Sequence, residues 1–328
     1  MLKPEVGSLK PMNETPTIAV TMGDPAGIGP EVALRATARL RRHARFLFVG
    51  DRAVLEVAAR RHRVGGEVAV VEVSSLPSAE RRPGKPSGGG AEAAYRSILR
   101  AVELVQSSEV DAIVTAPVSK HAIQALGVDF PGHTEVIARL AGGADVRMMM
   151  AGATLRIVLV TTHIRLLDVP RAITTGSVVR TAEIAAGSLR RHFGIRRPRL
   201  ALAGLNPHAG EAGAFGDEEI RTLAPAVRRA RARGIHIDGP HPPDTVFFRA
   251  RQGEFDAVIS LYHDQGLIPF KLVHFHDGVN VTLGLPFPRT SPDHGTAYDI
   301  AGRGVADPSS MAAAIRLAAQ MASPRGKS

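Results

Sequence analysis

The chain has 328 residues, 44% of them hydrophobic, and contains no cysteine. This length allows one large or two ordinary domains, and the lack of cysteine excludes disulfides, thiolate nucleophiles and thiolate metal ligands. Lys and Arg outnumber Asp and Glu by 41 to 31, but the arginines fall on helical patterns typical of solvated faces and aromatic residues are few, so we expect no nucleic-acid partner. No run is long enough to span a membrane and the first residues lack an apolar segment, so we expect a cytoplasmic protein without a membrane partner.

Short apolar runs alternate with helical patterns along the chain, which predicts an α/β fold with a mostly parallel sheet covered by helices. In the first half the expected strands are 17–23, 46–50, 67–73 and 111–118, and the expected helices are 30–43, 52–62 and 90–107. In the second half the expected strands are 147–152, 155–163, 199–208 and 256–263, and the expected helices are 171–193 and 217–233.

Three of the expected strands end on histidines, namely His163, His208 and His263. Because ligands bind outside the carboxyl ends of parallel strands, the three imidazoles can converge in one crevice. Three histidines are a recurrent ligand set for a catalytic divalent metal, with positions left open for substrate or water. Each histidine could instead only pack at the end of its strand, but three at equivalent positions favour a metal site.

Residues 21–31, TMGDPAGIGPE, match part of a dinucleotide-binding fingerprint. Gly27 and Gly29 follow a strand, and Asp51 ends the next one, where a ribose-binding carboxylate would lie. Val32 occupies the place of the third glycine, so the pattern favours a tight turn before a helix. Asp24 either has a function or orders this turn.

Two further clusters indicate a small anionic substrate. His133 and Thr134 lie in PGHTE at an expected helix start, where backbone N–H groups favour a phosphate, although Thr134 could simply cap the helix. Lys271 and Arg289 could bind a phosphate or a carboxylate, or each could pair with a buried Asp.

Between residues 21 and 304 several motifs occur in an order that resembles the 4-hydroxythreonine-4-phosphate dehydrogenase family of pyridoxal phosphate biosynthesis. They include TMGDPAGIGPE, APVSK, PGHTE, GLNPHAGE, YHDQGLIPFK and DHGTAYDIAG. GIGPE and HGTAYDIAGRGVADP are also similar to segments of the isocitrate and isopropylmalate dehydrogenase class. The resemblance implies a two-domain α/β/α fold of that type, with the active site in the cleft between a domain of residues 1–128 plus 295–328 and a domain of residues 129–294.

The resemblance also implies roles for individual residues. One divalent metal (Zn, Co, Mg or Mn) would be bound by ligands from both subunits of a homodimer, at His163, His208 and His263. Substrate would be bound by His133, Thr134, Lys271, Asn280 and Arg289. The similarity to the wider class assigns the cofactor NAD, or alternatively NADP, to Gly295, Thr296 and Asp299. The candidate proton acceptors, which the sequence does not rank, are Lys120, Asp244 and Asp264.

The implied reaction is the metal-assisted oxidation of 4-phosphohydroxy-L-threonine by NAD to a β-keto acid, which loses carbon dioxide to give 3-amino-2-oxopropyl phosphate. Relatives that oxidise D-threonate or D-erythronate 4-phosphate share these motifs, so the choice among these substrates stays open. A dihydrodiol dehydrogenase of aromatic carboxylates is a more distant alternative. Such an enzyme needs no phosphate site, whereas the motifs PGHTE and PFPRTS are intact in this chain. A non-catalytic protein that binds a metal or a phosphorylated metabolite is an alternative of another class.

Overall fold

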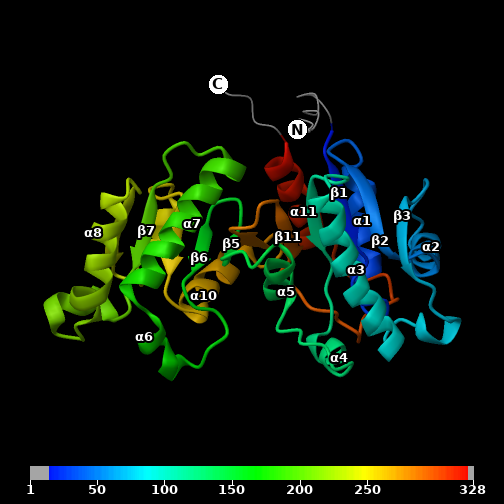
Figure 1. Ribbon diagram of the computed structural model, residues 1–328, viewed down its shortest axis with the longest axis horizontal. Helices are drawn as coiled ribbons and strands as arrows, with labels where there is room; N and C mark the ends of the chain where they lie inside the picture. The colour runs from blue at the N-terminus through cyan, green and yellow to red at the C-terminus, as the bar shows by residue number, and fades with distance from the viewer. Residues whose placement is uncertain (1–14, 324–328) are drawn as a thin grey trace, which may run out of the picture.

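One eleven-stranded sheet organises the part of the chain that the computed structural model describes, residues 15–323 (Figure 1). In their order across the sheet the strands are β3 (Val70–Ser74), β2 (Arg45–Asp51), β1 (Thr17–Thr21), β4 (Ala112–Thr115), β11 (Arg289–Pro292), β10 (Val279–Leu283), β5 (Arg147–Ala151), β6 (Arg156–Leu159), β9 (Ala257–Ser260), β7 (Leu200–Ala203) and β8 (Ile237–His241). Neighbouring strands are parallel except in the middle, where β10 is antiparallel to both β11 and β5, and β5 is antiparallel to β6. The predicted α/β fold with a mostly parallel sheet is therefore confirmed.

The α-helices connect the strands and cover both faces of the sheet. They are α1 (Gly29–Leu40), α2 (Arg52–Arg61), α3 (Gly88–Gln106), α4 (Lys120–Gln124), α5 (His133–Leu140), α6 (Val169–Ala172), α7 (Thr175–Phe193), α8 (Ala224–Ala232), α9 (Val246–Arg251), α10 (His263–His274) and α11 (Ser309–Ala322). We call β1 to β4 with α1 to α5 the first lobe, and β6 to β9 with α6 to α10 the second lobe. Figure 1 shows the two lobes side by side, with β5, β11 and α11 between them.

One face of the sheet carries a continuous hydrophobic core under α1, α11, α7 and α8. This core takes alternate residues from strands of both lobes, among them Val20 in β1, Val114 in β4, Val281 in β10 and Ile259 in β9. Because alternate residues of a strand point to opposite faces, each of these strands contributes a second set of side chains to the other side. The shared core joins the two lobes into one molecule.

The opposite face of the sheet carries two separate cores. One lies under α3 and α5 in the first lobe and includes Ile113 and Phe130, and the other lies under α9 and α10 in the second lobe and includes Val258 and Phe270. Between them, β10 and β11 turn polar side chains to this face, since the neighbouring residues of these strands point into the continuous core. The gap between the two cores is where a cleft forms.

The sequence patterns predicted eight of the eleven strands of the sheet. Strands 17–23, 46–50, 67–73 and 111–118 were expected and are present with shifted ends, whereas β8, β10 and β11 were missed. The alternation in Val279–Leu283 is the signal that predicts β10. The three strands expected to end on histidines all stop earlier: β6 at Leu159, β7 at Ala203 and β9 at Ser260. His263 is instead the first residue of helix α10.

The predicted domain boundaries fall within connected structure. Helix α5, assigned to the second domain, packs with α3 in the core of the first lobe, and the sheet runs through both predicted domains. The ends of the predicted first domain, residues 1–14 and 324–328, lie outside the described residues. Between residues 15 and 323, no helix has the length and apolar character that a membrane span requires.

Candidate active site

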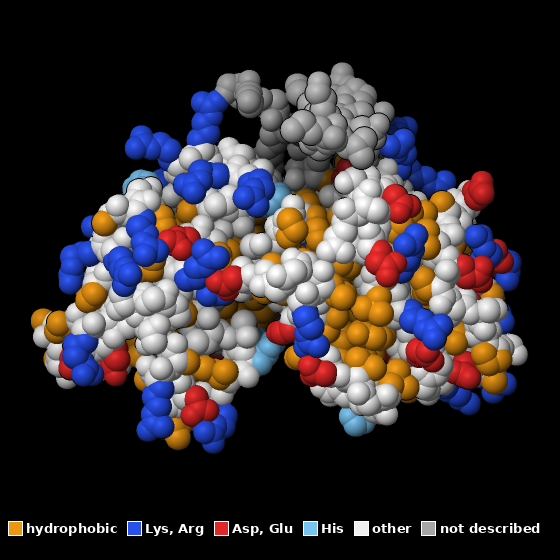
Figure 2. Space-filling model, in the orientation of Figure 1, with side chains coloured by type: hydrophobic (Ala, Val, Ile, Leu, Met, Phe, Trp, Pro, Cys, Tyr) orange, Lys and Arg blue, Asp and Glu red, His pale blue; other side chains and the backbone are white. Residues whose placement is uncertain are grey.

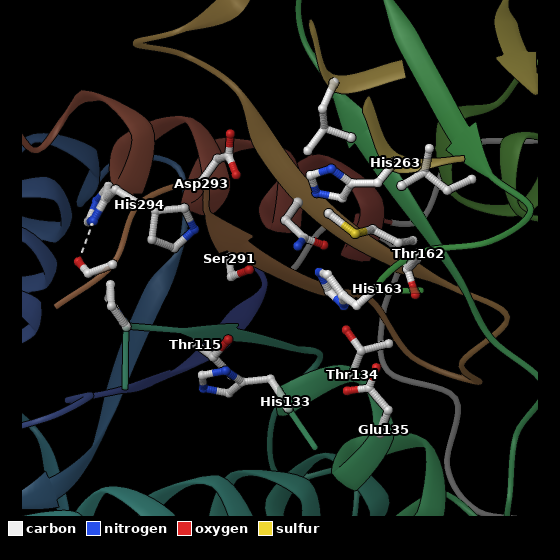
Figure 3. Close-up of a pocket in the computed structure, with 18 of the residues that line it drawn as sticks. Thr115, His133, Thr134, Glu135, Thr162, His163, His263, Ser291, Asp293 and His294 are labelled. Carbon is white, nitrogen blue, oxygen red and sulfur yellow. Dashed lines mark hydrogen bonds between the residues drawn. The ribbon is translucent and has the colours of Figure 1, made fainter. Parts of the chain in front are cut away.

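A cavity of about 970 Å³ lies between the two lobes, on the face of the sheet with the divided core. Figure 2 shows this hollow with a histidine side chain at its edge, and Figure 3 shows the lining side chains. Most of the residues predicted for the site line this cleft, namely Lys120, His133, Thr134, His163, His263, Asp264, Lys271, Asn280, Arg289 and Gly295. The tertiary structure therefore brings together residues that are up to 175 positions apart in the chain.

Arg289, on the central strand β11, places a buried cation at the floor of the cleft. The residue is 2% exposed, and its guanidinium donates hydrogen bonds to the hydroxyls of Thr115 (2.6 Å) and Thr282 (3.0 Å) and a longer one to that of Thr134 (3.5 Å). Its Nε has no partner in the described part of the chain. Burial lowers the pKa of Arg289 to about 10, so the group stays charged at neutral pH. A buried cation held only by neutral hydroxyls is suited to bind an anion.

Other buried polar atoms at the cleft also lack partners among the described residues. They are Nε2 of His133, the first residue of α5, Oδ1 of Asn280 on β10, and Nε2 of His294. Burial, helped by the charges of Arg289 and Lys120, holds the pKa of His133 well below its usual range, so its imidazole is neutral. These atoms can form hydrogen bonds with a polar ligand, and the first turn of α5 adds backbone N–H groups that favour an anion.

The sequence left a second role open for two cleft residues, a helix cap for Thr134 and an ion pair with an Asp for Lys271. The proposed N-cap role of Thr134 is wrong, because Gly132 is the N-cap of α5 and no side chain caps this helix. Thr134 instead accepts the hydrogen bond from Arg289 described above. Lys271 on α10 does pair with an Asp, since its Nζ lies 3.0 Å from Oδ2 of Asp293. Of these two cations, Lys271 is thus paired with a carboxylate, whereas Arg289 has only hydroxyl partners among the described residues.

Two of the three predicted metal ligands lie together in the cleft. The ring centroids of His163 and His263 are 5.6 Å apart (Figure 3). Nδ1 of His263 lies 2.7 Å from Oδ1 of Asp264, a contact that leaves Nε2 as the nitrogen for a metal. Burial, and then the charge of Lys120, lowers the pKa of His163, which keeps its imidazole neutral as a metal ligand requires. Both side chains therefore fit the first two ligands of a metal.

The third predicted ligand, His208, does not line this cleft. The expectation that all three imidazoles converge is wrong within one chain, because residues 15–323 contain no group of three His, Asp or Glu that could hold a metal. His208 lies on an exposed loop after β7, where it and Ala209, Glu211 and Ala212 all adopt left-handed backbone conformations. Such strain in non-glycine residues persists only where the surroundings impose it and is common at functional sites.

Glu219 holds this strained loop in place from the buried side. Its Oε1 accepts hydrogen bonds from the backbone N–H groups of Leu205 (2.7 Å) and Asn206 (2.8 Å), and its Oε2 accepts one from the side chain of Asn206. The Glu219 side chain is itself 4% exposed. The loop is thus fixed in a shape that presents His208 on the protein surface.

The candidate proton acceptors fall in two places. Lys120, the first residue of α4, and Asp264 line the cleft, whereas Asp244 is an exposed residue before α9 and is not among the lining residues. The cleft also contains polar residues that the sequence-based site did not include, namely Thr115, Glu135, Thr162, Ser291, Asp293 and His294 (Figure 3). Glu135, Asp293 and His294 stand inside the quoted motifs PGHTE and DHGTAYDIAG, which is the signal that could have found them.

The predicted cofactor residues lie on the loop after β11. Gly295 lines the cleft, while Thr296 and Asp299 do not. The carbonyl of Thr296 accepts a hydrogen bond from the N–H of Ile28 (2.9 Å), so this loop packs on the turn after β1. The ribose-binding interpretation of Asp51 is wrong: its fully buried carboxylate accepts hydrogen bonds from the N–H groups of Val54 and Leu76 and caps α2.

A cleft between two α/β lobes, with a buried uncompensated cation and two adjacent imidazoles, defines an enzyme that takes a small anionic substrate. The family model of the pyridoxal phosphate biosynthetic protein PdxA matches residues 24–318. The chain belongs to this family, and it is a dehydrogenase. The family resemblance seen in the sequence motifs is thereby confirmed.

Individual relatives agree over almost the whole chain. The 4-hydroxythreonine-4-phosphate dehydrogenase of Geobacter metallireducens is 49% identical, covering 96% of this chain and 98% of that protein. The D-threonate 4-phosphate dehydrogenase of Cupriavidus necator is 46% identical, covering 94% and 98%. The crystal structure of 4-hydroxythreonine-4-phosphate dehydrogenase from Klebsiella pneumoniae has a TM-score of 0.85 and 42% identity, covering 94% of this chain and 98% of that chain.

Proposed function

We propose that the protein oxidises 4-phosphohydroxy-L-threonine with NAD to a β-keto acid, which then decarboxylates to 3-amino-2-oxopropyl phosphate. The observation that carries this proposal is the buried, charged Arg289, which has only hydroxyl partners among the described residues. A phosphorylated amino acid supplies the anion that this cation lacks. The names of the relatives, most of them 4-hydroxythreonine-4-phosphate dehydrogenases, support the same substrate.

The cleft offers complementary groups for each part of this substrate. Arg289, the cationic Lys271 and the N–H groups at the start of α5 are matched to its phosphate and carboxylate. The neutral imidazole of His133 and the amide of Asn280 are matched to its hydroxyl and amino groups, because each has a buried polar atom without a partner among the described residues. NAD would lie along the loop that contains Gly295, Thr296 and Asp299.

The reaction also needs a metal and a proton acceptor. His163 and His263 of one subunit, with His208 of a second copy, would hold a divalent ion (Zn, Co, Mg or Mn), which supplies a Lewis acid that lowers the pKa of the substrate alcohol. Asp264 and Lys120 line the cleft, and either would accept the alcohol proton, Lys120 only as the neutral amine. Asp244, outside the cleft of its own chain, would have to act from the second copy.

Helix α10 supports a homodimer. Ile268, Leu272 and Phe275 are 68%, 87% and 69% exposed, and their spacing places them on one stripe of the helix, opposite the buried Leu267 and Phe270. An exposed apolar stripe beside a metal site that lacks one ligand is suited to a second copy of the chain. This arrangement would bring His208 of one subunit to the cleft of the other.

The test is NADH formation by purified protein with a defined metal content. We expect turnover of 4-phosphohydroxy-L-threonine that stops when a chelator is added. D-Threonate and D-erythronate 4-phosphates are the second candidate substrates, which the 46% identity to the Cupriavidus necator enzyme supports, and they are assayed in parallel. A preference for either sugar acid would replace the proposed substrate and keep the chemistry. If metal-loaded protein turned over none of the three compounds, the proposal would be contradicted.

We expect Gly132→Ala to lower kcat/KM by about 10- to 100-fold, because displacing a catalytic group by about 1 Å has effects of this size. A Cβ at Gly132 would lie 2.7 Å from Oε2 of Glu135 and 3.2 Å from Nζ of Lys120, so both cleft side chains would have to move. The melting temperature should change little, because φ at Gly132 is 168°, an extended value open to any residue. Steady-state kinetics and a thermal melt measure both effects.

Gly187→Ala on α7 is the matched control for this substitution, because no atom lies within 4 Å of the added Cβ. It should retain full activity. If Gly132→Ala also retained full activity, the positions of Lys120 and Glu135 over the Gly132 backbone would not matter for the reaction.

A further inference from the structure

A buried hydrogen bond joins two loops that the proposed mechanism does not otherwise connect. Asp24, in the turn after β1, is 2% exposed. Its Oδ1 accepts a hydrogen bond from the N–H of Ala26 (2.9 Å), and its Oδ2 accepts one from the hydroxyl of Tyr298 (2.5 Å). Burial, and then Asp24, raises the pKa of Tyr298 to about 12, so this hydroxyl keeps its proton and acts as the donor at neutral pH.

The same pair contacts the segment that leads to Lys120. The backbone N–H of Asp24 donates to the carbonyl of Pro117 (2.9 Å). The hydroxyl of Ser119 lies beside the Tyr298 oxygen and partly offsets the rise of its pKa. Ser119 is the N-cap of α4, accepting from the N–H of Ala122 (3.2 Å), and Lys120 is the first residue of that helix. The position of Lys120 therefore depends on a segment held by Asp24 and Tyr298.

The loop on which Tyr298 lies is held at a second point by backbone contacts. The N–H of Ile28 donates to the carbonyl of Thr296, and a Cβ at Gly27 would lie only 2.8 Å from that carbonyl oxygen. Gly84 also lies near the carbonyl of Tyr298, whose oxygen would be 3.1 Å from an added Cβ. The loop with Gly295 and Thr296 is thus tied to the turn after β1 and, through Tyr298, to the start of α4.

We propose that the Asp24–Tyr298 pair is a positioning device that fixes the cofactor loop relative to Lys120. Neither residue lines the cleft, so both act through the residues they hold. The inference rests on the proposed function, because it takes residues 295–299 as the dinucleotide site. It assigns to Asp24 a role that goes beyond ordering its own turn, since its carboxylate holds Tyr298 and its backbone N–H holds the segment before α4.

Tyr298→Phe tests the inference, because it removes only the hydroxyl. We expect kcat/KM for NAD to fall by roughly 10- to 100-fold, the range for losing a hydrogen bond to a charged group, and calorimetry to show weaker NAD binding. Binding of the phosphorylated substrate without NAD should stay unchanged. Asp24→Asn retains an acceptor oxygen and should lose less than Tyr298→Phe. Tyr95→Phe, on α3 and outside the cleft lining, is the matched control and should behave as wild type.

The outcomes separate this inference from the proposed function. Wild-type protein that neither binds NAD nor reduces it would overturn both. An active wild type with an equally active Tyr298→Phe variant would overturn the positioning role alone. A variant with a lower melting temperature but unchanged kinetic constants per folded molecule would overturn it as well, because the hydroxyl would then serve stability only. If Tyr298→Phe does not fold, Asp24→Asn must show the same selective loss toward NAD, and its absence would overturn the inference.

Discussion

Arg289→Met is expected to lower kcat/KM for the phosphorylated substrate by about 1000-fold, because losing one partner of a buried charge pair costs about 2–5 kcal/mol. The melting temperature of the ligand-free protein should not fall. Burial lowers the pKa of Arg289, which means that its charge destabilises the folded state at neutral pH, and this penalty is relieved only as the pH rises above about 10. Methionine keeps much of the packing without the charge.

Two measurements distinguish anion binding from a purely structural role of Arg289. Inorganic phosphate should raise the melting temperature of the wild type and not that of Arg289→Met, because a ligand stabilises only the state that binds it. Arg96→Met, which removes an exposed arginine paired with Glu92 on α3, should change activity by less than about twofold. A large fall in the melting temperature of Arg289→Met would show that the guanidinium mainly holds Thr115, Thr134 and Thr282 together.

His263→Ala and His208→Ala are each expected to abolish metal-dependent turnover and to weaken metal binding at least about 100-fold, since even the loss of a residue that only supports a ligand weakens it by about 10- to 100-fold. Mixing the two inactive variants should restore about a quarter of the wild-type activity, because about half of the dimers are then mixed and each mixed dimer has one intact site. Calorimetry with the metal alone provides a readout that does not depend on activity.

This complementation test depends on the separation of the histidines that the structure shows. His163 and His263 lie in the same cleft, so His163→Ala and His263→Ala should not complement each other. A mixture of these two variants is therefore compared directly with the mixture of His208→Ala and His263→Ala. His43→Ala, in the exposed turn between α1 and β2, is the control with full activity. No recovery in the His208 and His263 mixture would contradict a metal site shared between subunits.

 In a mixed dimer of His163→Ala and His263→Ala, each cleft has lost one of its own two ligands, so no site is intact. The mixture should stay as inactive as either variant alone. Activity in this second mixture would show that His163 and His263 do not serve the same metal, and it would contradict the pairing seen in the cleft.

Much of the fold and most of the site could be predicted from local patterns. Short apolar runs predicted eight of the eleven strands, and the polar residues that follow several of them marked the carboxyl edge where the cleft lies. The central strands β10 and β11 were missed because they carry polar residues on one face. Asn280 and Arg289 stand in these strands with polar side chains that line the cleft.

The sequence by itself determined the α/β class, the family motifs and the identity of the residues in the cleft, because these depend on residue type, spacing and order. The tertiary structure decided which of them pair: Lys271 with Asp293, Arg289 with three threonines, Asp24 with Tyr298 and Asp51 with the backbone of Leu76. It also placed His208 outside the cleft of its own chain. Such contacts join residues far apart in sequence, so they are set by strand order and register and by the packing of loops, which no local pattern encodes.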